Sequence, residues 1–398
     1  MYIFLPYMQR DHLSDLYLQI IKVKIISRIS NVVMGALVMK PRERVLRAVM
    51  HEEPDRVPLF EIAVSPLVLS KIFNKEQWEC NSLTAGWEAE FDLYKKLGLD
   101  CSTAYTLMFN PKYYEMIDND KVVDSWGRIF NTTDIAGTAS RGFYVGGYLT
   151  TPEKYEEFPK LDPLDLWGTE QFESALKAAS DRIFPIAAVG SIWEVQGEAL
   201  GWENIFRYMF TKPDFVKKVL EDSTNFLIEL GKACIDLGAE ILLDWDDYGY
   251  THGPMISPKH FRQFIFPCLK RAADEFHRKG AFLMVHSDGD IRLLMDMIIE
   301  AGVDLIQPLE PHANMNISDV AEKWGDKICL VGNIDVAHLL PYGTSQEVSR
   351  EVKEAIGAAA PGGGYILGSG HQINDWCKPE NFLTQIKAGK KFGKYPVN

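Results

Sequence analysis

The sequence has few cysteines, and no two of them have metal-binding or redox spacing. The six are Cys80, Cys101, Cys234, Cys268, Cys329 and Cys377, and no two lie within four positions of each other. A C-x-x-C zinc or redox motif and a dense disulfide framework are therefore excluded. The pattern indicates a reducing compartment, and we expect a cytoplasmic protein.

Long uncharged apolar runs are also missing. The most apolar segment lies in the first 38 residues, where the longest uncharged run, 29–39, has 11 residues. This run is too short to span a bilayer, and the segment lacks the pattern of a signal peptide. We therefore expect no membrane partner. Residues 1–38 are expected to be an N-terminal extension without a structured role, or alternatively an accessory helix, ahead of one domain at 39–398.

Positive charge is scarce as well. The 42 Lys and Arg residues face 55 Asp and Glu residues, so the net charge is −13, which argues against nucleic acid as a partner. No G-x-G-x-x-G follows a predicted strand and no Walker A motif is present, so nothing indicates a nucleotide-binding fold. With 46% hydrophobic residues, the chain has enough apolar material for a sizeable core and can bind a small molecule.

A regular alternation of elements dominates the chain from residue 184 onward. Short apolar runs occur at 184–189, 239–243, 281–285, 303–306, 328–331 and 365–367, separated by amphipathic helical stretches. Together with runs at 57–62 and 99–104 they make eight strands, which predicts a (β/α)8 TIM barrel. An open doubly wound sheet is the alternative. Residues 64–180 are rich in Trp and Tyr and are expected to be irregular, apart from a helix near 85–97.

Polar and titratable residues follow six of these strands. In a parallel barrel the carboxyl ends of the strands meet at one rim, where active sites lie. The candidate site residues at this rim are Glu194, Asp244, Asp246, Asp247, Tyr248, His286, Asp288, Glu310, Asn333 and His371.

Each of these residues also has an ordinary structural explanation. A single Asp or His after a strand is most often a helix N-cap, which is the better interpretation for Asp290 and Asp335. The adjacent carboxylates Asp246 and Asp247 are harder to explain, because they repel each other unless a cation or a proton is near.

Three of the candidates form a chemically coherent set. His286 and Asp288 alternate as strand residues do, so both side chains can point to the same side. With His371 they would supply two imidazoles and one carboxylate, which is a plausible set of metal ligands.

Several segments together resemble the uroporphyrinogen decarboxylase superfamily. The matching pieces are "KPRERVLRAVMHEEPDRVP" (40–58), "DSWGRIF" (124–130), "GAEILLDWDDYGYTHGPMISPKHFRQFIFP" (238–267), "HSDGDIRLLMDMIIEAGVDLIQPLEP" (286–311), "LVGNID" (330–335) and "GSGHQINDWCKPENF" (368–382). Their order and spacing extend from about Met39 to the end of the chain. The resemblance implies a (β/α)8 barrel, in agreement with the strand pattern.

The superfamily holds two chemistries, and the resemblance to the first is incomplete. Uroporphyrinogen decarboxylases carry an arginine-rich "RQAGR" segment after the first strand. The corresponding region here reads "RVPLFEIAVSPLVLSKIF" and has no arginine between Arg56 and Arg128. A substrate with many carboxylates needs several cationic anchors, so the sequence argues against this decarboxylation.

The second branch contains cobalamin-linked methyltransferases, which bind zinc through an H-x-C pair and a later cysteine. The resemblance places His286, Asp288 and His371 at these positions, so both cysteines are replaced. Histidine and carboxylate make a harder, more Lewis-acidic site than thiolates, suited to a substrate oxygen. Methyl ethers, such as methoxylated aromatics that anaerobes demethylate, would fit.

The leading hypothesis is a methyltransferase that moves a methyl group between a small substrate and a corrinoid. Zinc, or alternatively iron(II), would be bound by His286, Asp288 and His371. No D-x-H-x-x-G motif is present, so a partner protein would carry the corrinoid. The expected catalytic residues are Asp246, Asp247 and Glu310, and the expected substrate-binding residues are Glu194, Asp244, Tyr248 and Asn333. The alternatives are a decarboxylase of the uroporphyrinogen type and a non-catalytic relative that binds a small molecule.

Overall fold

The computed structural model describes residues 39–74, 83–105, 115–118, 120–131 and 143–397. The described residues from Lys40 onward belong to one compact unit. The predicted extension, residues 1–38, lies outside the described residues. Among the helices of the described ranges, none combines the length and the apolarity that a membrane span requires.

The centre of this unit is a parallel eight-stranded barrel. Its strands, in sheet order, are β1 (Phe60–Glu61), β2 (Cys101–Tyr105), β7 (Phe184–Gly190), β8 (Ile241–Trp245), β11 (Phe282–Ser287), β12 (Leu305–Pro308), β13 (Cys329–Ile334) and β14 (Tyr365–Ser369). A parallel bridge between Leu59 and Leu367 joins β14 back to the chain at β1, where the Leu367 N–H donates to the Pro58 carbonyl at 2.9 Å. The predicted (β/α)8 barrel and all eight of its predicted strands are confirmed.

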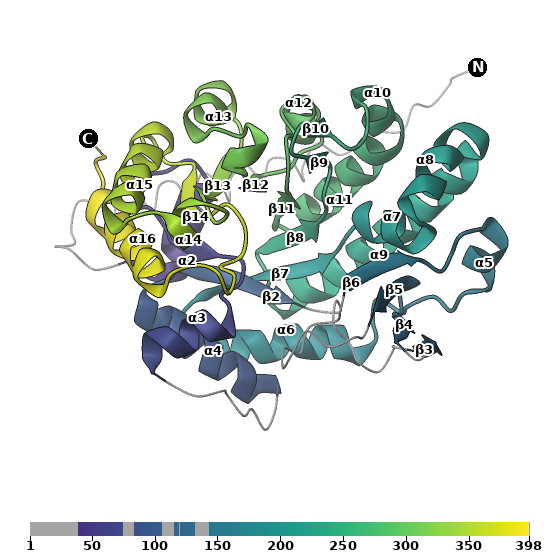
Figure 1. Cartoon of the computed structure of the whole chain (residues 1–398), viewed down its shortest axis with the longest axis horizontal. Helices are drawn as coiled ribbons and strands as arrows, with labels where there is room; N and C mark the ends of the chain where they lie inside the picture. Colours follow the sequence, from purple (N-terminus) through teal and green to yellow (C-terminus); the bar gives the residue numbers. More distant parts are fainter. Residues whose placement is uncertain (1–38, 75–82, 106–114, 119, 132–142, 398) are drawn as a thin grey trace, which may run out of the picture. The chain divides into compact units, whose positions relative to one another are not determined.

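Helices surround the strands (Figure 1). The longer ones are α4 (Leu83–Leu97), α6 (Leu166–Ala179), α8 (Trp202–Thr211), α9 (Pro213–Leu237), α11 (Phe266–Arg278), α15 (Ser345–Ala359) and α16 (Pro379–Phe392). The shorter ones are α2 (Pro41–Val49), α3 (Pro66–Phe73), α5 (Pro152–Glu157), α7 (Glu194–Leu200), α10 (Pro258–His260), α12 (Met295–Glu300), α13 (Ile317–Trp324) and α14 (Leu339–Tyr342), with a π-helical turn at Phe261–Ile265 and a 3-10 turn, η3, at Pro311–Ala313. Local sequence explains several of their ends. For example, α15 begins with a Thr344–Glu347 capping box, and α9 ends at left-handed Gly238 (φ 115°).

Successive side chains of each strand point to opposite faces, so the strands contribute to two separate apolar cores. One set of strand side chains, including Phe60, Leu243, Met284 and Ile366, fills the inside of the barrel. The larger core lies between the strands and the helices. Because His286 has the same parity as Met284, its side chain points into the barrel, whereas Asp244 has the opposite parity to Leu243 and points away from it.

The region expected to be irregular contains a second sheet. This antiparallel sheet consists of β3 (Glu115–Asp118), β4 (Lys121–Val123), β5 (Arg128–Asn131) and β6 (Phe143–Gly147). Outside that region, after β8, a short hairpin pairs β9 (Gly249–Tyr250) with β10 (Gly253–Pro254). Neither the four-stranded sheet nor the β9–β10 pair was predicted from the sequence. Strand β3 is exposed along its whole length, so it lacks the apolar alternation that marks a half-buried strand.

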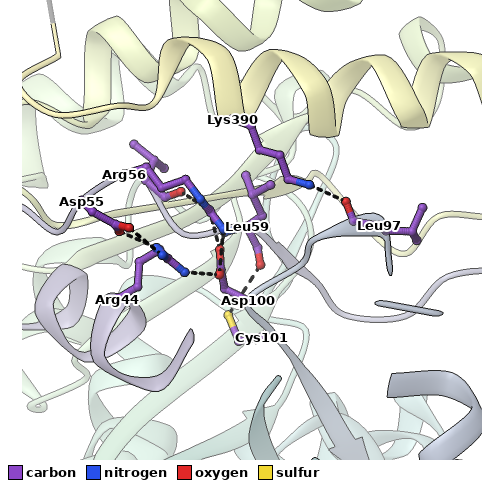
Figure 2. A network of polar contacts seen from close by, with 9 residues as sticks. Arg44, Asp55, Arg56, Leu59, Leu97, Asp100, Cys101 and Lys390 are labelled. Carbon is purple, nitrogen blue, oxygen red and sulfur yellow. Dashed lines mark hydrogen bonds and ion pairs between the residues drawn. The ribbon is translucent and has the colours of Figure 1, made fainter. Parts of the chain in front are cut away.

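An ion-pair network holds the amino-terminal end of the barrel (Figure 2). Asp100, directly before β2, accepts hydrogen bonds from the guanidinium groups of Arg44 (2.6 Å) and Arg56 (2.6 and 2.9 Å) and from the Leu59 N–H (2.9 Å). Arg44 of α2 also donates to Asp55 at 2.6 and 2.7 Å. The side chains of Arg44 and Asp100 are 3% and 2% exposed, so removing Asp100 would take the carboxylate from Arg56 and leave buried Arg44 with Asp55 as its ion-pair partner.

We predict that Asp100→Ala lowers the free energy of unfolding by about 3–5 kcal/mol, the usual cost of breaking a buried ion pair. The matched control is Asp181→Ala, which breaks the pair with Lys40, whose side chains are 69% and 73% exposed. That variant should change stability by at most about 1 kcal/mol. Urea unfolding of the three proteins compares them, and equal stabilities would contradict the structural role of Asp100.

A buried carboxyl group lies at the seam where the barrel closes. Glu61 Oε1 accepts from Ser369 Oγ of β14 at 2.9 Å and from Gln385 Nε2 of α16 at 2.7 Å, while Oε2 is buried without a partner among the described residues. Burial raises the pKa of Glu61 to about 8, although the hydrogen bonds from Ser369 and Gln385 act in the opposite direction. Glu61 is therefore protonated in the folded protein near neutral pH.

This protonation gives a pH-dependent stability. Between the ordinary Glu pKa of about 4.3 and a pKa of about 8, the folded state keeps a proton that the unfolded state loses, so stability falls as pH rises through this window. Relative to Glu61→Gln, wild type should lose at least about 1.4 kcal/mol between pH 5 and pH 8. Urea unfolding at both pH values measures this, with the exposed Glu43→Gln as control. The prediction is wrong if the free energy of unfolding changes equally with pH in wild type and in Glu61→Gln.

Candidate metal centre at the barrel rim

Three predicted ligands converge at the carboxyl ends of the strands. His286 lies in β11, Asp288 follows β11, and His371 follows β14. One ligand atom of each residue lies within 4.8 Å of the others. Asp288 Oδ2 lies 3.2 Å from His371 Nε2, and Asp288 Oδ1 lies 3.7 Å from His286 Nε2. The barrel thus brings together side chains that are 85 positions apart in the sequence.

The surroundings of His286 orient its imidazole. Its Nδ1 shares a hydrogen bond with Gln307 Oε1, the side chain directly across from it on β12. Because an amide oxygen only accepts, Nδ1 is the donor in this bond, and Nε2 faces Asp288 Oδ1 at 3.7 Å. The ring stacks on Trp245 with centroids 5.1 Å apart and planes at 27°, and Trp245 in turn contacts Tyr105 at 5.2 Å.

The charge state of Asp288 fits a cation site. Burial raises its pKa, but the hydrogen bond from His371 and the fields of both imidazoles outweigh burial, so the pKa of Asp288 lies below its usual range. For His371, burial is the largest single effect and lowers the pKa, but the hydrogen bond to Asp288 and the charges of Asp288, Asp247 and Glu310 together raise it. Asp288 Oδ1 is buried without a hydrogen-bond partner among the described residues, which is costly unless something else neutralises it. The donor set therefore fits a divalent metal ion held by two imidazoles and a carboxylate.

Two further predicted residues flank this centre. Asp247 Oδ1 accepts the Asp288 N–H at 2.8 Å and lies 3.9 Å from His286 Nε2. Glu310 Oε2 accepts the Gly289 N–H at 3.2 Å. Burial raises the pKa of both carboxyl groups, and the charge of Asp288 adds to this effect. Both side chains hold the loop that carries Asp288 and are partly exposed at the rim.

Asp246 has a different environment from its neighbour Asp247. It is fully buried, and its carboxylate accepts from Ser191 Oγ, from the Tyr248 hydroxyl at 2.9 Å, and from the backbone N–H groups of residues 192, 193 and 194 at 2.7–3.1 Å. The N–H groups of residues 193 and 194 are unpaired donors at the start of α7, so Asp246 caps that helix although it lies 52 residues away from Glu194 in the sequence. Even so, burial raises the pKa of Asp246 to about 6. Because hydrogen bonds from these donors already engage both oxygens of Asp246, the structure argues against the catalytic role that the sequence suggested for this residue.

Most of the predicted substrate-binding residues are likewise engaged in hydrogen bonds within the protein. Asp244 and Tyr248 are fully buried and belong to the same network, where the Tyr248 hydroxyl lies 3.4 Å from Asp244 Oδ2. Asn333 Nδ2 donates to the carbonyls of Leu309 and Met315, both at 2.9 Å, and so ties two loops together. These contacts argue against direct substrate binding by all three residues.

Glu194 is the exception among the predicted substrate-binding residues. It begins α7, and burial followed by the charge of Asp247 raises its pKa well above the usual range. Its backbone N–H donates to Asp246 at 2.7 Å, so Glu194 lies beside the β8 loop that also carries Asp247.

Comparison with known proteins places the chain in a family. The family model described as "Uroporphyrinogen decarboxylase (URO-D)" matches residues 134–392. The chain belongs to the uroporphyrinogen decarboxylase family.

Within the family, similarity extends to proteins of different activity. The chain is 25% identical to the methylated-thiol–coenzyme M methyltransferase of Methanosarcina mazei over 250 residues, which are 61% of this chain and 62% of that protein. It is also 25% identical to the uroporphyrinogen decarboxylase of Pseudoalteromonas translucida over 251 residues, 60% of this chain and 68% of that protein. The solved structure of a methyltransferase from Methanosarcina mazei aligns with a TM-score of 0.69 at 19% identity, over 89% of this chain and 99% of that one, which confirms the fold.

Gln307 and Trp245 were not among the predicted site residues. Both follow from register, because pairing β11 with its neighbours sets Gln307 and Trp245 directly beside His286. Gln307 Nε2 is buried without a partner among the described residues, so its N–H groups can donate a hydrogen bond to a bound molecule.

The different roles of the two adjacent aspartates can be tested. Asp246→Ala leaves several buried donors unpaired and should lower the free energy of unfolding by about 2 kcal/mol or more. Asp247→Ala removes one hydrogen bond at a partly exposed position and should cost about 1 kcal/mol or less. Urea unfolding of both variants measures the difference, and equal losses would refute the assignment of Asp246 to the helix cap.

Proposed function

We propose that the chain is a metal-dependent methyltransferase that moves a methyl group between a small substrate and a corrinoid carried by a partner protein. The observation that carries this proposal is the convergence of His286, Asp288 and His371 around the unpaired Asp288 Oδ1. The methyltransferase among the relatives is consistent with it. We further propose zinc as the ion, with iron(II) as the alternative, and a cytoplasmic location.

The positions of two arginines favour methyl transfer over decarboxylation. Arg56 pairs with Asp100 at the amino-terminal end of the barrel, the end opposite His286. Arg128 is buried and pairs with Asp124 and Glu198 at 2.7 and 3.1 Å. Neither is free to anchor a polycarboxylate, and no arginine lies between them in the sequence. The carboxylate of Asp288, whose pKa lies below its usual range, would also repel such a substrate.

The ligand set suggests which heteroatom carries the methyl group. His286, Asp288 and His371 would hold a divalent metal, which would supply Lewis acidity toward a substrate oxygen. The rings of Trp245 and Tyr105 form an aromatic wall beside His286, which suits an aryl methyl ether. When the methyl carbon leaves its oxygen, that oxygen becomes an alcohol or phenol and needs a proton. Asp247 and Glu310 would orient the substrate, and one of these two carboxyl groups would donate that proton.

Metal content and methyl transfer test the proposal together. The purified full-length protein should bind an equivalent of zinc that His286→Ala and His371→Ala lose, whereas His252→Ala, at an exposed histidine outside both histidine clusters, should keep it. Wild type given 2-methoxyphenol and cob(I)alamin should form methylcobalamin, seen in the visible absorption spectrum. The two rim variants should lower this rate at least about 100-fold, because they remove ligands of the ion.

The contrary outcomes separate the alternatives. A zinc stoichiometry that is the same in wild type, His286→Ala and His371→Ala would overturn the metal centre. Release of carbon dioxide from uroporphyrinogen without methyl transfer would favour the decarboxylase. Zinc bound by these residues with neither activity would favour a small-molecule-binding relative.

A further inference from the structure

A second group of two histidines and one aspartate lies on the loops after β12 and β13. His312 belongs to the η3 turn, Asp335 follows β13, and His338 precedes α14. His312 Nε2 lies 2.7 Å from His338 Nδ1 and 2.9 Å from Asp335 Oδ1, and His338 Nδ1 lies 3.9 Å from Asp335 Oδ2. None of the three belongs to the centre formed by His286, Asp288 and His371.

Hydrogen bonding alone does not account for this arrangement. Asp335 Oδ1 already accepts the N–H groups of Ala337 and His338 at 2.7 and 2.9 Å. The atom His312 Nε2 faces two acceptors at short distance but carries at most one proton, which cannot point along both contacts. If His338 Nδ1 supplies a proton instead, the lone pair of His312 Nε2 faces the carboxylate directly. A cation shared by the three atoms resolves this conflict.

The separations also fit a metal ion. Zinc lies about 2.0–2.2 Å from histidine nitrogen and carboxylate oxygen, so its tetrahedral ligands are about 3.3 Å apart. His312 Nε2 lies 2.7 Å from His338 Nδ1 and 2.9 Å from Asp335 Oδ1, and His338 Nδ1 lies 3.9 Å from the other oxygen, Asp335 Oδ2, so the separations bracket this value. The side chain of His338 is 70% exposed, which leaves room for water to complete the coordination.

We propose that His312, Asp335 and His338 form a second divalent-metal site. Two imidazoles and one carboxylate select a borderline transition ion such as Zn²⁺, Ni²⁺, Co²⁺ or Cu²⁺ over Mg²⁺ or Ca²⁺. The site is built in advance, because the backbone bonds to Asp335 fix the turn at 335–338, and the Asp335 N–H donates to Glu351 of α15 at 3.2 Å.

The ion would connect two neighbouring loops of the rim. Its ligand His312 is two residues from Glu310, which bonds the loop that carries Asp288. An occupied second site would therefore restrain η3 and, through it, the position of Glu310. This link does not depend on the first centre being catalytic.

Metal binding to full-length variants tests the proposal. Each protein is stripped with a chelator and titrated with Zn²⁺ in competition with a chromophoric chelator. In the His371→Ala background, which lacks the first centre, one equivalent should still bind. It should disappear in His371→Ala/His312→Ala/His338→Ala, and His371→Ala/His252→Ala should keep it. Asp335→Asn in the same background keeps an oxygen acceptor for the turn and should weaken binding at least about tenfold.

Cu²⁺ added to His371→Ala should give an electron paramagnetic resonance spectrum with nitrogen coupling, and loss of His312 and His338 should remove that coupling. The proposal is overturned if His371→Ala binds no zinc at micromolar concentration. It is also overturned if the triple variant binds as much as His371→Ala. Both results concern only this cluster, so they stay distinguishable from failure of the proposed methyltransferase, which is measured at His286 and His371.

Discussion

The hydrogen-bonded closure of β14 against the chain at β1 is the constraint on which the candidate site depends. Parallel pairing all the way around the barrel puts every strand's carboxyl end at the same rim. His371, two residues beyond β14, thereby comes within reach of His286 in β11. The period of two along β11 then turns His286 inward beside Gln307 and Trp245.

The two ends of the barrel use charge in opposite ways. At the amino-terminal end, Arg44, Arg56 and Asp100 compensate one another in a buried network (Figure 2). At the carboxyl-terminal rim, carboxyl groups and imidazoles gather, and in the described part of the chain no arginine or lysine contacts the central three ligands. An excess of negative groups in a partly buried place favours a bound cation, as proposed for both histidine clusters. This division agrees with the general rule that barrels keep stability at one end and chemistry at the other.

Much of the fold followed from the sequence, because the eight strands are short apolar runs of the kind that a buried parallel sheet requires. The roles of individual rim residues did not follow as readily. Asp246 and Asp247 are adjacent and chemically identical, yet one caps α7 and the other meets Asp288. The difference arises from the path of residues 191–194, which no local pattern around Asp246 reveals. The second cluster was missed for a similar reason. Asp335 does act on the turn at 337–338 as a cap would, but its approach to His312 depends on packing between two loops.

The central claim is that this member of the uroporphyrinogen decarboxylase family binds its metal through nitrogen and oxygen alone. X-ray absorption at the zinc edge measures this most directly, on His312→Ala/His338→Ala protein loaded with one equivalent of Zn²⁺, so that only the first centre contributes. We expect a single shell of nitrogen and oxygen at about 2.0–2.2 Å, with imidazole scattering behind it. A zinc–sulfur distance of about 2.3 Å, or a spectrum unchanged by His371→Ala, would contradict it.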